Sequence, residues 1–246
     1  MTFRKSALDR SVAMHLAETE FSRCAELLGS LHGSDWQTRT ECPEWDVRQM
    51  AAHMLGMVEM AASVREGRRQ SKAATVGGAF DIDAMTALQV TERVDWTGPR
   101  IAARFAQRWP AAVKGRRRTP WFMRRTAIPP IPINGSPEVW SLGYLVDVIL
   151  TRDPWTHRMD ISRALGREPL VTADHDGLLV ADVVAEWAAR HGKDFTLHLT
   201  GPAGGTWSVG SNGPDIELDA VEFCRVLSRR PGAVPLEMLM STEVPF

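Results

Sequence analysis

The hydrophobic pattern of the chain changes near Gly166, and this change constrains the fold more than any other feature of the sequence. Before Gly166, apolar residues recur every three or four positions, which is typical of helices that bury one face. After it, short segments alternate apolar and polar residues, which is typical of half-buried strands. We therefore expect a mostly α fold with a smaller α+β part, divided into residues 1–168 and 169–246.

Four helices are predicted in the first part. They cover residues 8–29, a segment from Pro43 to about residue 61, residues 97–113, and a segment from after Pro137 to about Leu165 that Pro154 can interrupt. The Gly-rich polar stretch 66–81 is predicted to be a long connection, and the Pro-rich stretch 114–137 cannot be regular throughout. Four helices joined by long connections fit an antiparallel four-helix bundle.

The second part is predicted to be a small α+β domain. A helix over 174–191 precedes a strand over 194–200, in which apolar and polar residues alternate. The segment "GPAGG" predicts a turn, and the segments 206–210 and 215–219 predict two further short strands. A short helix over 220–230 follows.

The net charge and the cysteine content indicate which partners the protein can attract and in which cellular compartment it works. The formal net charge of −1 gives no overall attraction to nucleic acid or to an anionic membrane. No segment approaches the roughly 18 apolar residues of a membrane span, and the polar N-terminus is unlike a secretory signal. The three cysteines form no CxxC pair and are odd in number, which fits a reducing compartment. We therefore expect a cytoplasmic location and no membrane partner.

The segment 151–167, "TRDPWTHRMDISRALGR", carries ionisable residues on an otherwise apolar helix. At 100° per residue, Asp153, His157 and Asp160 lie within about 60° of one another. Ionisable groups on a core-facing stripe are costly unless they are paired or bind a metal. A carboxylate and a histidine four residues apart can both reach one ion, so this segment is a candidate for half of a metal site.

A structural interpretation of the same residues is also open. Asp153 precedes Pro154, and this pair is typical of an N-cap followed by the first helical position. Asp160 has Arg158 and Arg163 nearby as salt-bridge partners. Spacing alone does not decide between a metal site and a capped helix with a solvated flank.

A second candidate ligand lies in the segment 42–54, "CPEWDVRQMAAHM". His53 lies at the edge of an apolar stripe, where its side chain can point into a bundle cavity or remain partly exposed. Two histidines and one carboxylate from two helices would make a three-ligand site with an open position, and such sites suit catalysis better than structural roles.

Together, "CPEWDVRQMAAHM" and "RDPWTHRMDISRALG" resemble two motifs of the mycothiol-dependent maleylpyruvate isomerase family, in the same order and about a hundred residues apart. The tail "ELDAVEFCRVLSRRPG" is similar to the small C-terminal α/β domain of that family. The resemblance implies a DinB-like metal-binding four-helix bundle followed by this C-terminal domain.

The resemblance also implies the site residues. The two histidine ligands of the family match His53 and His157, and its carboxylate ligand falls on Asp153. In the isomerase this ligand is a glutamate, so the shorter aspartate requires an inward kink at Pro154 or an intervening water. The functional arginine at the end of the C-terminal helix matches Arg230, with Arg229 as the alternative register.

The implied chemistry is thiol activation. A divalent metal, for which zinc fits the N/O ligand set, holds mycothiol or another small thiol as a thiolate. The thiolate adds to an activated double bond or displaces a leaving group, which predicts an isomerase or an S-transferase that acts on a small molecule. Arg230 would bind a carboxylate of the substrate or of the thiol, and maleylpyruvate is one candidate substrate.

Two other function classes stay open. The same bundle would also serve a non-catalytic protein that binds a divalent metal or a small ligand. The basic, aromatic cluster over 114–125 suggests a contact with nucleic acid, although the near-neutral chain favours a solvated loop or an anion-binding rim. The sequence leaves open whether the chain forms a homo-oligomer.

Overall fold

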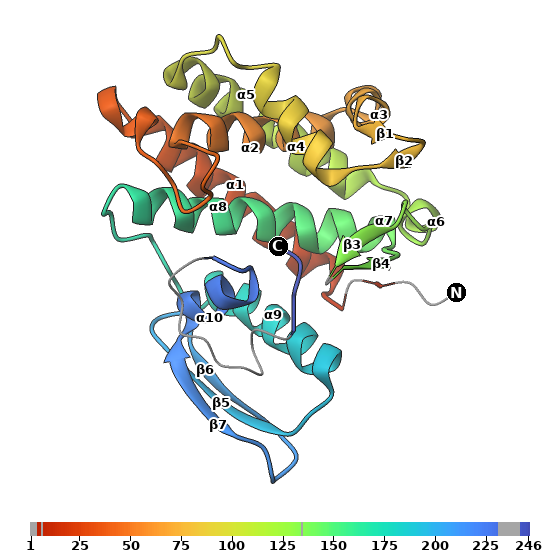
Figure 1. Cartoon of the computed structure of the whole chain (residues 1–246), viewed down its shortest axis with the longest axis vertical. Helices are drawn as coiled ribbons and strands as arrows, with labels where there is room; N and C mark the ends of the chain where they lie inside the picture. The colour runs from red at the N-terminus through yellow and green to blue at the C-terminus, as the bar shows by residue number, and fades with distance from the viewer. Residues whose placement is uncertain (1–3, 6, 134, 231–241) are drawn as a thin grey trace. The chain divides into compact units, whose positions relative to one another are not determined.

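The computed structural model describes residues 4–5, 7–133, 135–230 and 242–246 (Figure 1). The chain divides into two compact units, residues 1–167 and 168–246. Within the described residues, no helix is long and apolar enough to cross a membrane.

Four long helices form the bundle of the first unit. They are α1 (Arg10–Gly29), α2 (Val47–Ala62), α5 (Gly98–Arg118) and α8 (Leu150–Ala164). Helix α5 packs against α1 and α2, and α8 also contacts both of these helices (Figure 1). The predicted four-helix bundle is therefore confirmed.

Shorter elements connect these helices. They are a 3-10 helix (Gly33–Gln37), α3 (Val64–Ala73), β1 (Thr75–Val76), β2 (Ala79–Phe80), α4 (Ile82–Thr91), α6 (Trp121–Arg124), β3 (Ile131–Ile133), β4 (Ser136–Glu138), α7 (Leu142–Tyr144) and a π-helix (Leu145–Ile149). The strands form two antiparallel hairpins, β1–β2 and β3–β4.

The bundle core contains large apolar side chains from all four long helices. Examples that are at most 3% exposed are Phe21, Met50, Leu55, Phe105 and Ile161. The rings of Phe21 and Phe105 meet edge to face, with their centroids 6.2 Å apart. Fully burying each such side chain stabilises the fold by about 1.5–3 kcal/mol. This core therefore fixes the faces of α2 and α8 on which the candidate ligands lie.

Helix α2 begins at Val47, four residues later than predicted from Pro43. The reason is a capping box. The carboxylate of Asp46 accepts a hydrogen bond from the Gln49 amide at 2.7 Å, and the Gln49 side chain accepts one from the Asp46 amide at 2.9 Å. These two bonds satisfy amides that the first helical turn leaves free, and they stabilise the helix start at Val47.

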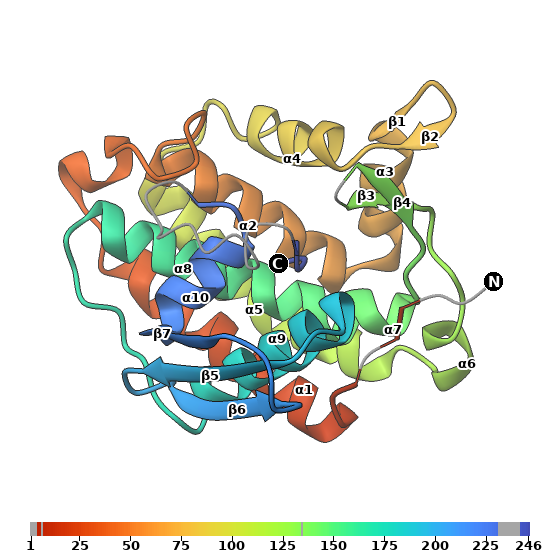
Figure 2. The same cartoon turned by 60° about the horizontal axis from the view of Figure 1, so that its bottom comes forward.

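The prediction of one long connection over 66–81 was wrong, because this stretch contains most of α3 and the β1–β2 hairpin. Helix α3 is strongly charged, so it lacks the apolar periodicity that reveals a helix in the sequence. It is stabilised locally, since Ser63 accepts a hydrogen bond from the Glu66 amide and Arg69 pairs with Glu66. Helix α4, which Asp81 caps, packs against α2 (Figure 2).

Pro154 does not interrupt α8, although proline lacks the N–H that would donate to the carbonyl of Leu150. Arg116 of α5 supplies a donor instead. Its Nη1 donates to the Leu150 carbonyl at 2.9 Å, and its Nε donates to the Val146 carbonyl at 2.7 Å. Helix α8 therefore continues through Pro154, directly after the π-helix.

The second unit contains α9 (Asp176–His191), β5 (Phe195–Thr200), β6 (Gly205–Val209), β7 (Asp215–Asp219) and α10 (Ala220–Leu227). The sheet order is β6-β5-β7, with β5 antiparallel to β6 and parallel to β7. The buried ring of Trp187 packs edge to face against Phe195 and Phe223, and so joins α9 to the sheet and to α10. The predicted α+β part is confirmed.

Candidate metal centre

The structure brings together His53 of α2 and Asp153 and His157 of α8. Nε2 of His53 lies 3.2 Å from Oδ1 of Asp153, and Nε2 of His157 lies 3.4 Å from the same oxygen. One donor atom from each of the three residues lies within 4.8 Å of the others. Both histidines are buried and the aspartate side chain is 14% exposed. The three candidate ligands therefore form one compact cluster.

The N-cap interpretation of Asp153 was wrong. Helix α8 begins at Leu150, so Asp153 lies inside the helix and directs Oδ1 at the two imidazoles. Its second oxygen, Oδ2, is buried and has no hydrogen-bond partner within the described part of the chain. Aspartate reaches both histidines without a break at Pro154, although it is shorter than the glutamate of the isomerase.

The second ring nitrogen of His157 faces Asp160. Oδ2 of Asp160 lies 3.4 Å from Nδ1 of His157. Two arginines were considered as partners of Asp160. Of these, Arg158 binds Glu20 at 2.7 Å and Arg163 binds Glu41 at 3.0 Å. Asp160 is therefore placed to orient the His157 ring, as carboxylates commonly do for histidine ligands.

Two neighbours of the cluster were not predicted as functional residues. Oε1 of Gln89 lies 2.7 Å from Nδ1 of His53, and Gln89 belongs to the unpredicted helix α4. The ring of Trp45 lies 5.1 Å from the His53 ring and 6.1 Å from the His157 ring, measured between centroids. Trp45 belongs to the "CPEWD" motif, which is the sequence signal for it. No local signal in the sequence indicates Gln89.

The charges of the cluster shift one another's pKa. Burial alone would lower the pKa of His157, but the Asp153 carboxylate outweighs this effect and raises the pKa to about 9. Burial alone would likewise raise the pKa of Asp153, but the two imidazoles hold it well below its usual range. In the absence of a metal, Asp153 is therefore ionised and His157 is protonated at neutral pH.

We expect the metal-free protein to lose stability as the pH rises from 6.5 to above 9. The pKa of His157 is about 9 in the folded protein and 6.5 in the unfolded chain, so protonation of His157 stabilises the fold. This stabilisation is complete below pH 6.5 and disappears as the pH rises through 9. The expected loss is about 3 kcal/mol of unfolding free energy. Urea unfolding across this range measures it. His157→Gln should show a shallower decline, and equal slopes for the two proteins would contradict the prediction.

The residues of the cluster fit a divalent metal. Ligand atoms about 2.0–2.2 Å from a tetrahedral ion lie roughly 3.3–3.6 Å from one another. The two nitrogen–oxygen distances of 3.2 and 3.4 Å are close to this spacing. The buried Oδ2 of Asp153 is a further oxygen donor that lacks a partner among the described residues. Two imidazole nitrogens and a carboxylate are a common ligand set for zinc.

The two candidate arginines lie at the end of α10 in the second unit. Nη1 of Arg230 lies 3.2 Å from the carbonyl of Ser228, and Nη2 of Arg229 lies 3.1 Å from Glu243. Arg229 has a φ of 59°, in the left-handed region. The amide of Arg230 donates to the Arg225 carbonyl, and that of Arg229 donates to the Val226 carbonyl, so the helix ends in a Schellman motif.

The backbone of Arg229 is strained, because a residue with a Cβ seldom adopts a positive φ. We expect Arg229→Gly to be more stable than Arg229→Ala by about 1 kcal/mol, because only glycine adopts a positive φ without a clash of Cβ. Both variants remove the side chain and its pairing with Glu243, so their difference isolates the backbone. Chemical unfolding of the two variants measures it, and equal stabilities would contradict it.

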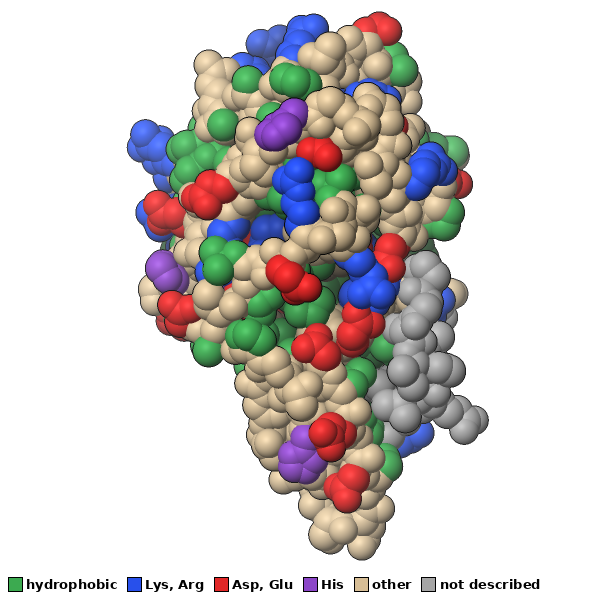
Figure 3. Space-filling view, turned by 90° about the vertical axis from the view of Figure 1, so that its left-hand side faces the viewer, with side chains coloured by type: hydrophobic (Ala, Val, Ile, Leu, Met, Phe, Trp, Pro, Cys, Tyr) green, Lys and Arg blue, Asp and Glu red, His purple; other side chains and the backbone are tan. Residues whose placement is uncertain are grey.

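Three of the six basic residues in the cluster over 114–125 are buried or paired within the fold. Arg116 is buried, Arg117 pairs with Glu18, and Arg124 pairs with the buried Asp147. Figure 3 shows a different face of the molecule, on which acidic and basic side chains are interspersed. Half of the basic residues counted in this cluster are therefore buried or paired with acidic residues of the same unit, which weakens the nucleic-acid interpretation.

Residues 17–162, more than half of the chain, match the family described as Mycothiol maleylpyruvate isomerase N-terminal domain. The fold is similar to a crystal structure of the mycothiol-dependent maleylpyruvate isomerase, with a TM-score of 0.60, 12% identity, and coverage of 97% of this chain and 95% of that one. A histidine-to-alanine mutant of that isomerase gives a TM-score of 0.57, 11% identity and coverage of 93% and 95%. No curated protein matches the chain significantly. The chain thus belongs to the mycothiol maleylpyruvate isomerase N-terminal domain family.

Proposed function

We propose that this protein is a metal-dependent enzyme that uses a small thiol, mycothiol in the first instance, as an isomerase or S-transferase. The observation that carries the proposal is the convergence of His53, Asp153 and His157 from two helices, together with the buried Oδ2 of Asp153. Family membership and the fold support the use of mycothiol.

In this proposal His53, Asp153 and His157 hold a divalent ion, with zinc as the first candidate. A bound divalent ion lowers the pKa of a coordinating thiol, so that the thiol is present as a thiolate at neutral pH. Trp45 lies against both imidazole rings, which are themselves buried. Arg230, or Arg229 in the alternative register, would bind a carboxylate of the substrate or of the thiol through paired N–H donors.

As an isomerase, the enzyme would use the thiolate as a nucleophile toward an activated cis double bond. Addition forms the C–S bond and converts the double bond into a single bond that rotates. Elimination then breaks the C–S bond, forms the trans double bond and returns the thiolate. Maleylpyruvate carries a double bond of this kind and is the substrate to test first. As an S-transferase, the same thiolate would displace a leaving group and remain bonded to the product.

The alternative is a non-catalytic protein that binds a divalent metal or a small ligand with the same residues. Two measurements on the full chain separate the proposals. We expect the purified protein to bind one divalent ion after supplementation with zinc, and the zinc-loaded protein to bind mycothiol by calorimetry more tightly than the metal-free protein does. Turnover of maleylpyruvate with mycothiol would establish the isomerase.

Each negative result has a specific meaning. If the supplemented protein holds no stoichiometric divalent ion, the metal site is wrong. If the loaded protein binds the metal but not mycothiol, the alternative of a metal-binding protein without thiol chemistry replaces the enzyme.

A further inference from the structure

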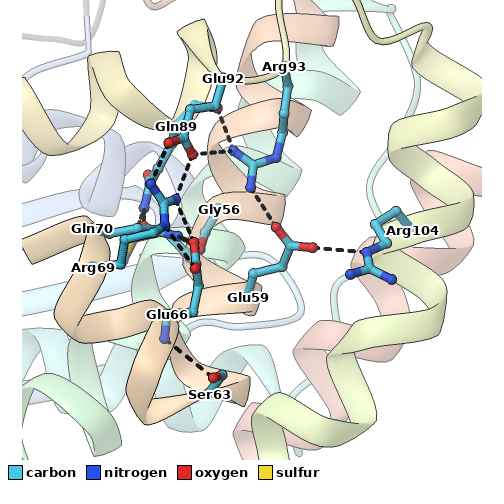
Figure 4. A network of polar contacts seen from close by, with 11 residues as sticks. Gly56, Glu59, Ser63, Glu66, Arg69, Gln70, Gln89, Glu92, Arg93 and Arg104 are labelled. Atoms are coloured by element: carbon cyan, nitrogen blue, oxygen red, sulfur yellow. Dashed lines mark hydrogen bonds and ion pairs between the residues drawn. The ribbon is translucent and has the colours of Figure 1, made fainter. Parts of the chain in front are cut away.

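A buried chain of side-chain amides leads away from His53. Gln89 Oε1 lies 2.7 Å from His53 Nδ1, and Gln89 Nε2 lies 2.8 Å from Gln70 Oε1. Gln70 Nε2 in turn lies 3.0 Å from Glu66 and 3.2 Å from the carbonyl of Gly56. Both glutamines are 0% exposed. Figure 4 shows Gln89, Gln70 and Glu66 in this network, which joins α4, α3 and α2.

The far end of the chain fixes the direction of every hydrogen bond in it. Hydrogen bonds from Arg69 lower the pKa of Glu66 to about 2, so its carboxylate is ionised at neutral pH and only accepts hydrogen bonds. The carbonyl of Gly56 also only accepts. The NH₂ group of Gln70 must therefore face both of them, since the opposite orientation would place its oxygen against two acceptors.

The orientation of the Gln70 amide also determines the orientation of Gln89 and the position of the hydrogen on the His53 ring. Because Gln70 presents Oε1, Gln89 must donate to it through Nε2, which also contacts the sulfur of Met57 at 3.3 Å. Gln89 then presents Oε1 to the ring of His53. An amide oxygen only accepts, so Nδ1 of His53 must carry a hydrogen. In the neutral ring, the lone pair is then on Nε2, the nitrogen that faces Asp153.

Helix α2 is built to let Gln89 approach. A Cβ at Gly56 would lie 2.4 Å from Cγ of Gln89, so no larger residue fits at this position without displacing Gln89. Glycine inside a helix costs about 0.5–1 kcal/mol relative to alanine. The close approach of Gln89 is the physical reason for a glycine at this position, one turn after His53.

We propose that Gln89, oriented by Gln70 and Glu66, is a positioning residue that keeps the hydrogen of His53 on Nδ1 and the lone pair of Nε2 available to a metal. This inference rests on the proposed metal site. Hydrogen-bond partners of metal-bound histidines orient the ring, and their loss typically lowers metal affinity by about 10–100-fold.

Two variants at one position isolate the effect. Gln89→Glu and Gln89→Met both remove the NH₂ donor to Gln70, but only the glutamate keeps an oxygen that accepts from His53 Nδ1. With a chromophoric chelator as competitor, we expect Gln89→Met to bind Zn²⁺ about 10–100-fold more weakly than the wild type. Gln89→Glu should restore most of the affinity. Equal affinities of Gln89→Met and the wild type would overturn the inference.

A measurement on the zinc-loaded wild type tests the same point if the variants fold poorly. In a ¹⁵N-labelled sample loaded with Zn²⁺, which replaces the hydrogen bond between Nε2 and Asp153, the His53 ring, assigned by its absence from His53→Ala, should carry its hydrogen on Nδ1. Protonation at Nε2 instead would overturn the inference. Wild-type protein that binds no Zn²⁺ would overturn the proposed function, whereas Zn²⁺ binding that is insensitive to Gln89→Met would overturn the inference alone.

Discussion

His53→Ala and His157→Ala are each expected to lower the affinity of the protein for Zn²⁺ by about 100-fold or more. The free energy of zinc binding at a structural site with four ligands is about 10–16 kcal/mol, which is roughly 3 kcal/mol per ligand. Losing about 3 kcal/mol of binding free energy lowers the affinity by about 100-fold or more. Each variant also leaves the Asp153 carboxylate with only one of its two imidazole partners. Zinc competition titrations of the full chain at pH 7 measure the effect.

The control is His198→Ala. His198 is exposed on β5, where its ring contacts Thr206, so its loss should leave zinc affinity unchanged. Asp153→Glu is an informative companion, because it keeps the carboxylate on a side chain that is one methylene longer. We expect it to bind zinc far more tightly than Asp153→Ala. Wild-type affinity in both histidine variants would show that the cluster is not the metal site.

Arg116→Met is expected to destabilise the first unit by about 3 kcal/mol. The guanidinium of Arg116 is buried and donates to the carbonyls of Val146 and Leu150 and to Oγ1 of Thr151. Hydrogen bonds from a charged donor contribute about 1.5–3 kcal/mol each, although the methionine recovers part of the loss by apolar packing. The free energy of urea unfolding measures the change.

A double-mutant cycle with Pro154→Ala tests the cause. Alanine at position 154 restores an N–H four residues after Leu150, so the Leu150 carbonyl regains a donor within the helix. Arg116→Met should then cost about 1 kcal/mol less in the Pro154→Ala background than in the wild type. Additive effects of the two substitutions would mean that Arg116 does not replace the missing N–H.

Much of the fold follows from patterns that are local in the chain. The apolar spacing along α1, α2, α5 and α8 reflects burial of one helical face, and it predicted the bundle. The alternation in β5 reflects a strand with one buried face, and it predicted the α+β part. Helix α3 was missed because charge pairs rather than an apolar stripe stabilise it.

The candidate ligands could be named from the sequence, but their neighbour Gln89 could not. The spacing of Asp153 and His157 puts both on one face of a helix, and the two motifs connect them with His53. Gln89 lies 36 residues from His53 in the chain, and its role depends on hydrogen bonds with residues of other helices. Such contacts leave no periodic signal.

The sequence by itself determined which residues are candidates for the site, because helical periodicity and motif spacing are properties of neighbouring positions. Only the tertiary structure decided where the Asp153 side chain lies. Its place before Pro154 favoured a helix cap, because proline within a helix leaves a carbonyl without its donor. Arg116, more than thirty residues away in the chain, supplies that donor, so α8 continues and Asp153 faces the two histidines.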